Sequence, residues 1–151
     1  MNNLVEQIGE NAIAAFKSGY NCAESTVQAF RMAGVVNISE DSLKLASGFG
    51  GGLGKARSLC GALSGCTMVL SSIAGRSNPH EKPLQEVYDL SREFHDVFQA
   101  HFGSVMCKDL MGFEFGTREH LKTCLVLSKD AAVLLAGFLQ DKGLLKLQGE
   151  A

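Results

Sequence analysis

Apolar residues recur at helical spacing along most of this chain, and this periodicity restricts the possible folds more than any other feature. One such stripe near the amino terminus consists of Leu4, Ile8, Ala12 and Phe16. Proline occurs only at Pro79 and Pro83, so few sites interrupt a helix. No segment alternates apolar and polar residues for long enough to predict a strand. The sequence therefore predicts an all-α fold.

Start and stop signals divide the chain into helices. Gly19 ends the first helix, and Asn21 with Glu24 forms a capping-box pattern that starts the second. Gly34 stops the second helix, and Ser39 opens a short third one. Further helices are expected at residues 58–74, 84–102 and 117–141, with a helical turn at 104–111. We expect one domain over residues 1–151, a bundle of about five to six helices with a glycine-rich loop.

Composition places the chain among ordinary globular proteins. Its 151 residues are 46% hydrophobic and 20% charged, and the net charge at pH 7 is −2. Acidic and basic residues are mixed along the chain, so no nucleic-acid partner is predicted. Residues 1–6 show no basic segment followed by an apolar run. We therefore predict no signal peptide and a cytoplasmic location.

Residues 58–75 carry no charge, and a run of this length is about the minimum for a membrane span. The run is interrupted by small and polar residues, namely Gly61, Ser64, Gly65, Thr67, Ser71 and Ser72. No second span accompanies it. We therefore predict a central buried helix and no membrane insertion, with Gly61 and Gly65 allowing another backbone to pack closely.

The glycine-rich loop does not carry a nucleotide-binding motif. It reads Gly48-Phe49-Gly50-Gly51-Gly52-Leu53-Gly54. A P-loop needs a glycine five positions before Gly54, where Phe49 stands, and Ser or Thr after Lys55, where Ala56 stands. No strand precedes the loop. Its glycines are better suited to close backbone approach, with amide N–H groups free to donate.

The cysteines are the main candidates for chemistry. They are Cys22, Cys60, Cys66, Cys107 and Cys124. An odd number in a reducing compartment argues against a disulfide framework, and no C-x-x-C pair occurs. Buried cysteines often act only as small hydrophobic residues. However, Cys22 follows a capping Asn and Cys60 is expected two or three residues into its helix, positions that favour the thiolate.

Helix geometry separates Cys60 from Cys66. Six residues at about 100° each place the two side chains roughly 120° apart around one helix. Cys60 is therefore the functional candidate, and Cys66 is predicted to be dispensable. The histidines, which are His80, His95, His101 and His120, form no H-E-x-x-H motif or catalytic triad pattern, so we predict no catalytic residue.

At these residues the sequence resembles a known family. Cys60-Gly61-Ala62-Leu63-Ser64-Gly65 matches C-G-A-x-x-G, with one cysteine upstream and two downstream. The supporting segments are Gly19-Tyr20-Asn21-Cys22-Ala23-Glu24, the glycine-rich loop and Cys107-Lys108-Asp109-Leu110-Met111-Gly112. Together they resemble the C-GCAxxG-C-C family, whose members are classed as redox-active. Similar sequence occurs in split-Soret cytochromes, where a cysteine-bound iron–sulfur centre accompanies haem, but the haem attachment cysteines are missing here.

The resemblance implies that Cys22, Cys60, Cys107 and Cys124 act together. The leading hypothesis is an electron-transfer protein in which these four thiolates hold a [2Fe–2S] or [4Fe–4S] cluster. The loop glycines Gly50, Gly51, Gly52 and Gly54 would wrap the cluster and hydrogen-bond its sulfurs. Metal-free thiol–disulfide chemistry and a structural zinc site in an interaction module are the alternatives.

Two expectations concern partners. The redox partner would be an unidentified electron donor or acceptor protein. We also expect a homodimer formed through helices, with the cysteine site close to the interface, because the helix at residues 84–102 carries a wide apolar face.

Overall fold

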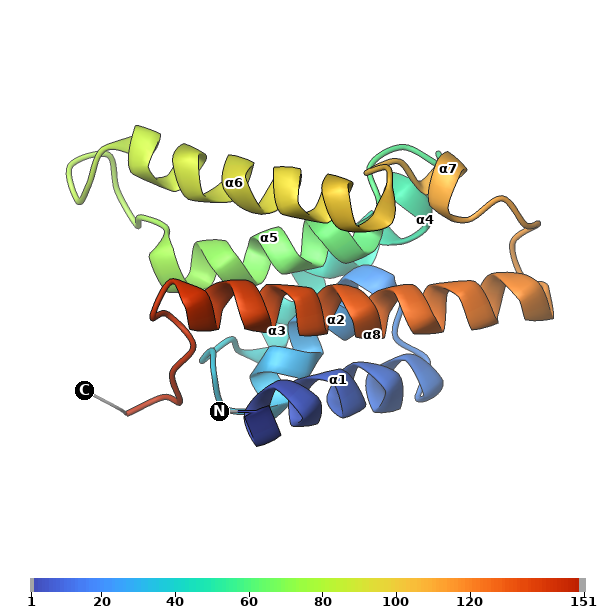
Figure 1. The fold of residues 1–151 in the computed structure, drawn as a ribbon, viewed down its shortest axis with the longest axis horizontal. Helices are drawn as coiled ribbons and strands as arrows, with labels where there is room; N and C mark the ends of the chain where they lie inside the picture. The colour runs from blue at the N-terminus through green and yellow to red at the C-terminus, as the bar shows by residue number, and fades with distance from the viewer. Residues whose placement is uncertain (1, 150–151) are drawn as a thin grey trace.

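The computed structural model describes residues 2–149 and confirms the all-α expectation (Figure 1). The long helices are α1 (Asn2–Lys17), α2 (Cys22–Met32), α5 (Gly61–Ala74), α6 (Leu84–Phe102) and α8 (Arg118–Asp141). The short elements are α3 (Glu40–Leu43), the 3-10 helix η1 (Lys44–Phe49), α4 (Gly50–Leu53) and α7 (Cys107–Leu110). Over residues 2–149 no strand forms, and Leu59 and Met106 make one isolated antiparallel bridge.

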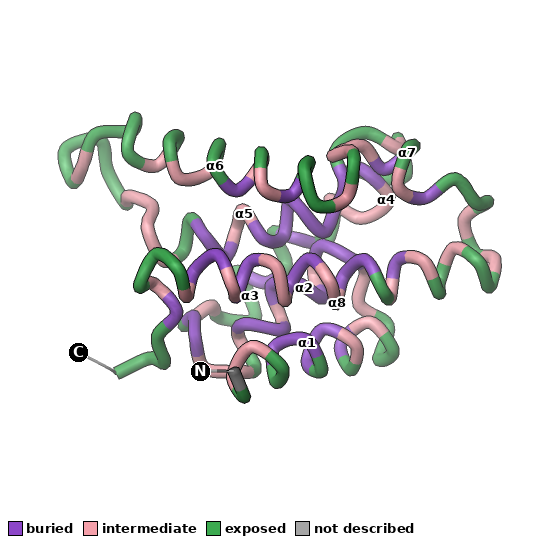
Figure 2. Tube along the Cα trace, viewed as in Figure 1, coloured by how far each residue is buried: buried purple, intermediate pink, exposed green. Residues whose placement is uncertain are grey.

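Helix α2 lies near the centre of the bundle. Helices α6 and α1 lie on opposite edges, with α5, α2 and α8 between them (Figure 1). Figure 2 shows that α2 and α5 are largely buried, whereas most of α6 is exposed. In α6 only Phe94 and Phe98 are fully buried, so this helix contributes a narrow stripe to the core. The amphipathic pattern of each helix therefore sets how deeply it lies.

Two glycines bring α5 very close to α2, as the sequence predicted. A Cβ atom at Gly65 would collide with the Thr26 hydroxyl and with the carbonyl oxygen of Ala23. A Cβ atom at Gly61 would lie 2.5 Å from the Cys22 sulfur and 2.7 Å from the Phe49 carbonyl oxygen. The close crossing therefore brings the start of α5 directly against the start of α2.

Helix boundaries agree with the sequence signals at most ends. The capping box at Asn21 and Glu24 is present, and Thr117 caps α8 by accepting from the His120 N–H. The exception is α5, which begins at Gly61 instead of Ser58. Residues 58–60 stay outside the helix because residues 57–60 pair with residues 105–108.

The glycine-rich loop forms a tight left-handed turn. Positive φ angles occur at Gly51 (67°), Gly52 (71°), Leu53 (73°), Gly54 (60°) and Lys55 (67°). Glycine adopts this conformation freely, whereas each non-glycine residue there costs about 1–2 kcal/mol. The turn therefore stores backbone strain beside the cysteines.

Two apolar helices bear on the membrane question. Helix α5 has 14 residues, fewer than the roughly 20 that a span needs. Helix α8 is long and apolar enough by composition, but half of its most apolar stretch is buried inside the protein. That burial is typical of a core helix, and the absence of membrane insertion stays a prediction.

Candidate functional site

Four cysteines lie where several helices begin, at one end of the bundle. Cys22 is the first residue of α2, Cys107 is the first residue of α7, and Cys124 lies in the second turn of α8. Cys60 immediately precedes α5, not two or three residues inside it, because the pairing of residues 57–60 delays the helix. The starts of α2, α5, α7 and α8 lie at this end of the bundle (Figure 1). We call these four residues the four-cysteine site.

The four thiols lie close enough to influence one another's ionisation. Burial, with smaller contributions from the nearby Cys22 and Cys107, raises the pKa of the Cys60 thiol to about 12. Burial also raises the pKa of the Cys124 thiol to about 12, with added contributions from Cys22, Cys107 and Cys60. Burial and Cys22 raise the pKa of the Cys107 thiol. Each of the four thiols therefore interacts electrostatically with the other three.

Backbone N–H groups partly offset this burial. Burial raises the pKa of the Cys22 thiol, but the N–H groups of Gly51, Ala23, Gly61 and Cys22 itself lower it. The N–H groups of Ala62 and Leu63 act in the same direction on Cys60, although no side-chain hydrogen bond caps α5. The helix-start effect expected from the sequence is present, but burial outweighs it, so the metal-free thiols are protonated at neutral pH.

Antiparallel backbone hydrogen bonds bring Cys60 and Cys107 together from distant parts of the chain. The Cys60 N–H donates to the Val105 carbonyl at 2.8 Å, and the Cys107 N–H donates to the Ser58 carbonyl at 2.7 Å. A Cβ atom at Gly52 would lie 2.6 Å from the Cys107 Cβ, so the loop must carry glycine there. The loop therefore packs directly on the cysteine site.

Arg57 connects the glycine-rich turn to the segment before α8 by hydrogen bonds. Its guanidinium donates to the carbonyl oxygens of Met111 at 2.7 Å and Phe113 at 2.6 Å. The same group lies 4.3 Å from the centre of the Phe115 ring. It also lowers the pKa of the Cys107 thiol, against the larger effect of burial. Arg57 thus positions the chain on two sides of the site.

Cys66 lies apart from this group. Its side chain is fully buried, and its Sγ donates to the Ala131 carbonyl at 3.6 Å. Burial strongly raises the pKa of its thiol, and Cys60 adds to this effect. Cys66 therefore bonds to α8, although its thiol still interacts with that of Cys60. That Cys66 is dispensable stays a prediction.

All five cysteines are free, without disulfides. Within residues 2–149, no group of three or more His, Cys, Asp or Glu side chains is arranged to hold a metal ion. The four thiols are neighbours but do not form a closed coordination shell. Their role as metal ligands therefore stays a prediction.

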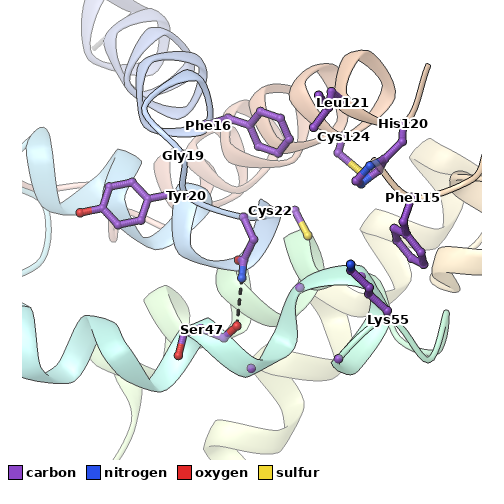
Figure 3. A pocket seen from close by; sticks show the side chains of 15 residues that line it. Phe16, Gly19, Tyr20, Cys22, Ser47, Lys55, Phe115, His120, Leu121 and Cys124 are labelled. Atoms are coloured by element: carbon purple, nitrogen blue, oxygen red, sulfur yellow. Dashed lines mark hydrogen bonds between the residues drawn. The ribbon is translucent and has the colours of Figure 1, made fainter. Parts of the chain in front are cut away.

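A cavity of about 560 Å³ opens onto the site (Figure 3). Its walls come from the end of α1, the start of α2, the glycine-rich turn and the start of α8. The lining residues are Phe16, Gly19, Tyr20, Asn21, Cys22, Ser47, Gly48, Gly50, Gly51, Gly54, Lys55, Phe115, His120, Leu121 and Cys124. Cys22 and Cys124 thus face the cavity, whereas Cys60 and Cys107 lie outside its lining, as does Gly52.

His120 also lines this cavity, although no sequence motif predicted it as a site residue. His120 precedes Cys124 by one helical turn, so the two side chains share a face of α8, and this spacing could have indicated it. Its Nδ1 accepts from the Gly116 N–H at 3.0 Å, and its ring lies 5.1 Å from that of Phe115. Burial, Lys55 and Arg57 lower its pKa, which favours the neutral ring.

Comparison with known proteins agrees with the four-cysteine pattern. Residues 20–138 match the model of a family described as "Putative redox-active protein (C_GCAxxG_C_C)". A protein of Archaeoglobus fulgidus called "Uncharacterized protein" is 26% identical over 145 residues, which cover 91% of this chain and 96% of that protein. No solved structure was found to match the chain.

Proposed function

We propose that this chain, which belongs to the C_GCAxxG_C_C family of redox-active proteins, holds an iron–sulfur cluster in its four-cysteine site and transfers electrons. The cluster would be of the [2Fe–2S] or [4Fe–4S] type, both of which are commonly held by four cysteines. The observation that carries the proposal is that four cysteines from separate helical segments lie where α2, α5, α7 and α8 begin. Backbone pairing holds Cys60 beside Cys107, and the close approach of Gly61 holds Cys22 against the start of α5.

The raised pKa values support a metal centre. Because the four buried thiols raise one another's pKa, four thiolates without a bound cation would be unfavourable in this site. Iron would supply positive charge that replaces the protons, so metal binding would stabilise an arrangement that is otherwise neutral. The donor set, four soft sulfur ligands without a nearby carboxylate in the cavity lining, suits iron–sulfur chemistry.

The surrounding backbone fits this role as well. The N–H groups of Gly51 and Gly61 act on the Cys22 sulfur, and such contacts raise the potential of a cysteine-bound cluster. The starts of α2 and α5 add the positive ends of two helix dipoles. When bound, the cluster would supply one-electron chemistry, and the chain would supply ligands, positive potential and exclusion of water.

Metal-free thiol–disulfide exchange is the second candidate, favoured by the access that the cavity gives to Cys22 and Cys124. It is disfavoured because the thiolate is the reacting form, and the Cys60 and Cys124 thiols have pKa values of about 12. A structural zinc site would use the same four ligands without redox chemistry.

One experiment separates the three candidates. The chain is purified without oxygen, reconstituted with iron and sulfide, and measured for absorption, electron paramagnetic resonance, iron, acid-labile sulfide and zinc. The expected result is a brown protein with about two or four iron atoms and equal sulfide per chain. A colourless protein with about one zinc per chain would establish the structural site instead, and one without any metal would leave only the thiol mechanism.

A further inference from the structure

The cavity over the four-cysteine site has an uneven distribution of charge. Of the residues that line it, all of which lie in the described part of the chain, Lys55 is the only one with a full charge. Asp and Glu are missing from this lining. Arg57 stacks on the wall residue Phe115, and burial together with Lys55 and Arg57 lowers the pKa of His120. The residues that line the cavity therefore carry a net positive charge, which Lys55 supplies.

Backbone geometry holds Lys55 in place. Lys55 is the last of five consecutive residues with positive φ, and its N–H donates to the Gly50 carbonyl at 3.3 Å. Its ammonium group lies 5.6 Å from the centre of the Phe115 ring. In Figure 3 the Lys55 side chain points into the cavity, toward the side on which Cys22 lies. A strained backbone thus presents one cation to the cysteine site.

The rest of the cavity is apolar and aromatic. Phe16, Tyr20, Phe115 and Leu121 form much of its wall, and glycines form the floor. The Asn21 side-chain Nδ2 is already hydrogen-bonded, because it donates to the Ser47 carbonyl at 3.0 Å. The volume of about 560 Å³ lies within the range of about 300–1,000 Å³ typical of small-molecule sites.

We propose that this cavity binds a small organic anion, with its charged group at Lys55 and its apolar part between the aromatic side chains, in contact with Cys22 and Cys124. This inference deepens the proposed function, because it names the class of molecule that is admitted to the cysteine site. Only Cys22 and Cys124 line the cavity, so a molecule bound there would contact these two cysteines and not Cys60 or Cys107.

Differential alkylation tests the proposal on the metal-free protein. Iodoacetate is a small organic anion, and iodoacetamide is its neutral counterpart. Mass spectrometry of peptides gives the rate of modification at each cysteine. We expect Cys22 and Cys124 to react before Cys60 and Cys107. We also expect Lys55→Gln to lower the iodoacetate-to-iodoacetamide rate ratio at Cys22 about three-fold, the effect of one screened charge a few ångströms away.

The matched control is Lys146→Gln, which removes an exposed lysine outside this cavity and should leave the ratio unchanged. An unchanged ratio in Lys55→Gln, or equal modification of all four cysteines, would overturn the proposal. Because the measurement uses no iron, it does not depend on the cluster. A protein that binds no cluster but keeps the charge selectivity would retain the anion site and lose only the proposed function.

Discussion

At the scale of single residues, Cys60 and Cys66 provide a matched pair of substitutions. Both are buried in the same segment, but Cys60 interacts with the other site cysteines and Cys66 bonds to α8. We expect Cys60→Ala to abolish cluster binding and Cys66→Ala to retain it with some loss of stability, about 1 kcal/mol. Iron and sulfide content of both variants is the measurement. Equal loss of iron in the two proteins would mean that the ligand set is wrong.

Gly61 offers a second test at this scale. An alanine there would place its Cβ 2.5 Å from the Cys22 sulfur, so we expect Gly61→Ala to cost about 1–3 kcal/mol and to weaken cluster binding. Gly137→Ala is the control, because nothing lies within 4 Å of its Cβ position in α8. Alanine is favoured over glycine in a helix, so this control should be neutral or stabilising. Urea unfolding of the metal-free proteins measures both effects.

At the scale of elements, the sequence signals predicted helices better than they predicted the site's geometry. The capping pattern at Asn21 and the stop at Gly34 are local, and both ends of α2 match the structure. The start of α5 does not, because residues 57–60 are held by residues 105–108, which no local pattern reveals. The left-handed turn was likewise not predicted, since Leu53 and Lys55 within it, and Arg57 after it, adopt positive φ only under tertiary constraint.

Arg57 tests this constraint at the element scale. Arg57→Gln removes two charge-assisted hydrogen bonds to the 111–113 segment and the contact with Phe115. We expect the segment between α7 and α8 to loosen, with faster amide hydrogen exchange at residues 112–116 and little change in α1. Uniformly faster exchange in all helices would instead indicate global destabilisation.

At the scale of the whole molecule, the thiols make stability depend on pH. The folded-state pKa values of about 12 at Cys60 and Cys124 exceed the ordinary value of 9.0. The folded state therefore holds these protons more tightly than the unfolded state. The resulting stabilisation is complete below about pH 9 and is lost as the pH rises toward about 12. Unfolding of the metal-free, reduced protein across this range should show the decline, and Cys60→Ala should show a smaller one.

Association of two chains is the remaining prediction at this scale. Helix α8 exposes Val126 by 50% beside a groove that Phe102 and Leu110 line between α6, α7 and α8. Leu127, one helical turn after Cys124, also lines this groove, and Leu110 belongs to the same short helix as Cys107, so a second copy bound there would lie close to the four-cysteine site. We therefore expect a homodimer, with a mass by light scattering of about twice the 16.1 kDa of one chain.

Charged substitutions locate the interface. Val126→Glu should restore the mass of a single chain, because it buries an unpaired carboxylate in the contact. Met32→Glu is the control, since Met32 is equally exposed at the end of α2, outside the groove. A wild-type mass of 16.1 kDa at micromolar concentration would exclude the dimer. Dissociation by Met32→Glu, with Val126→Glu still dimeric, would move the interface away from the cysteine site and onto α2.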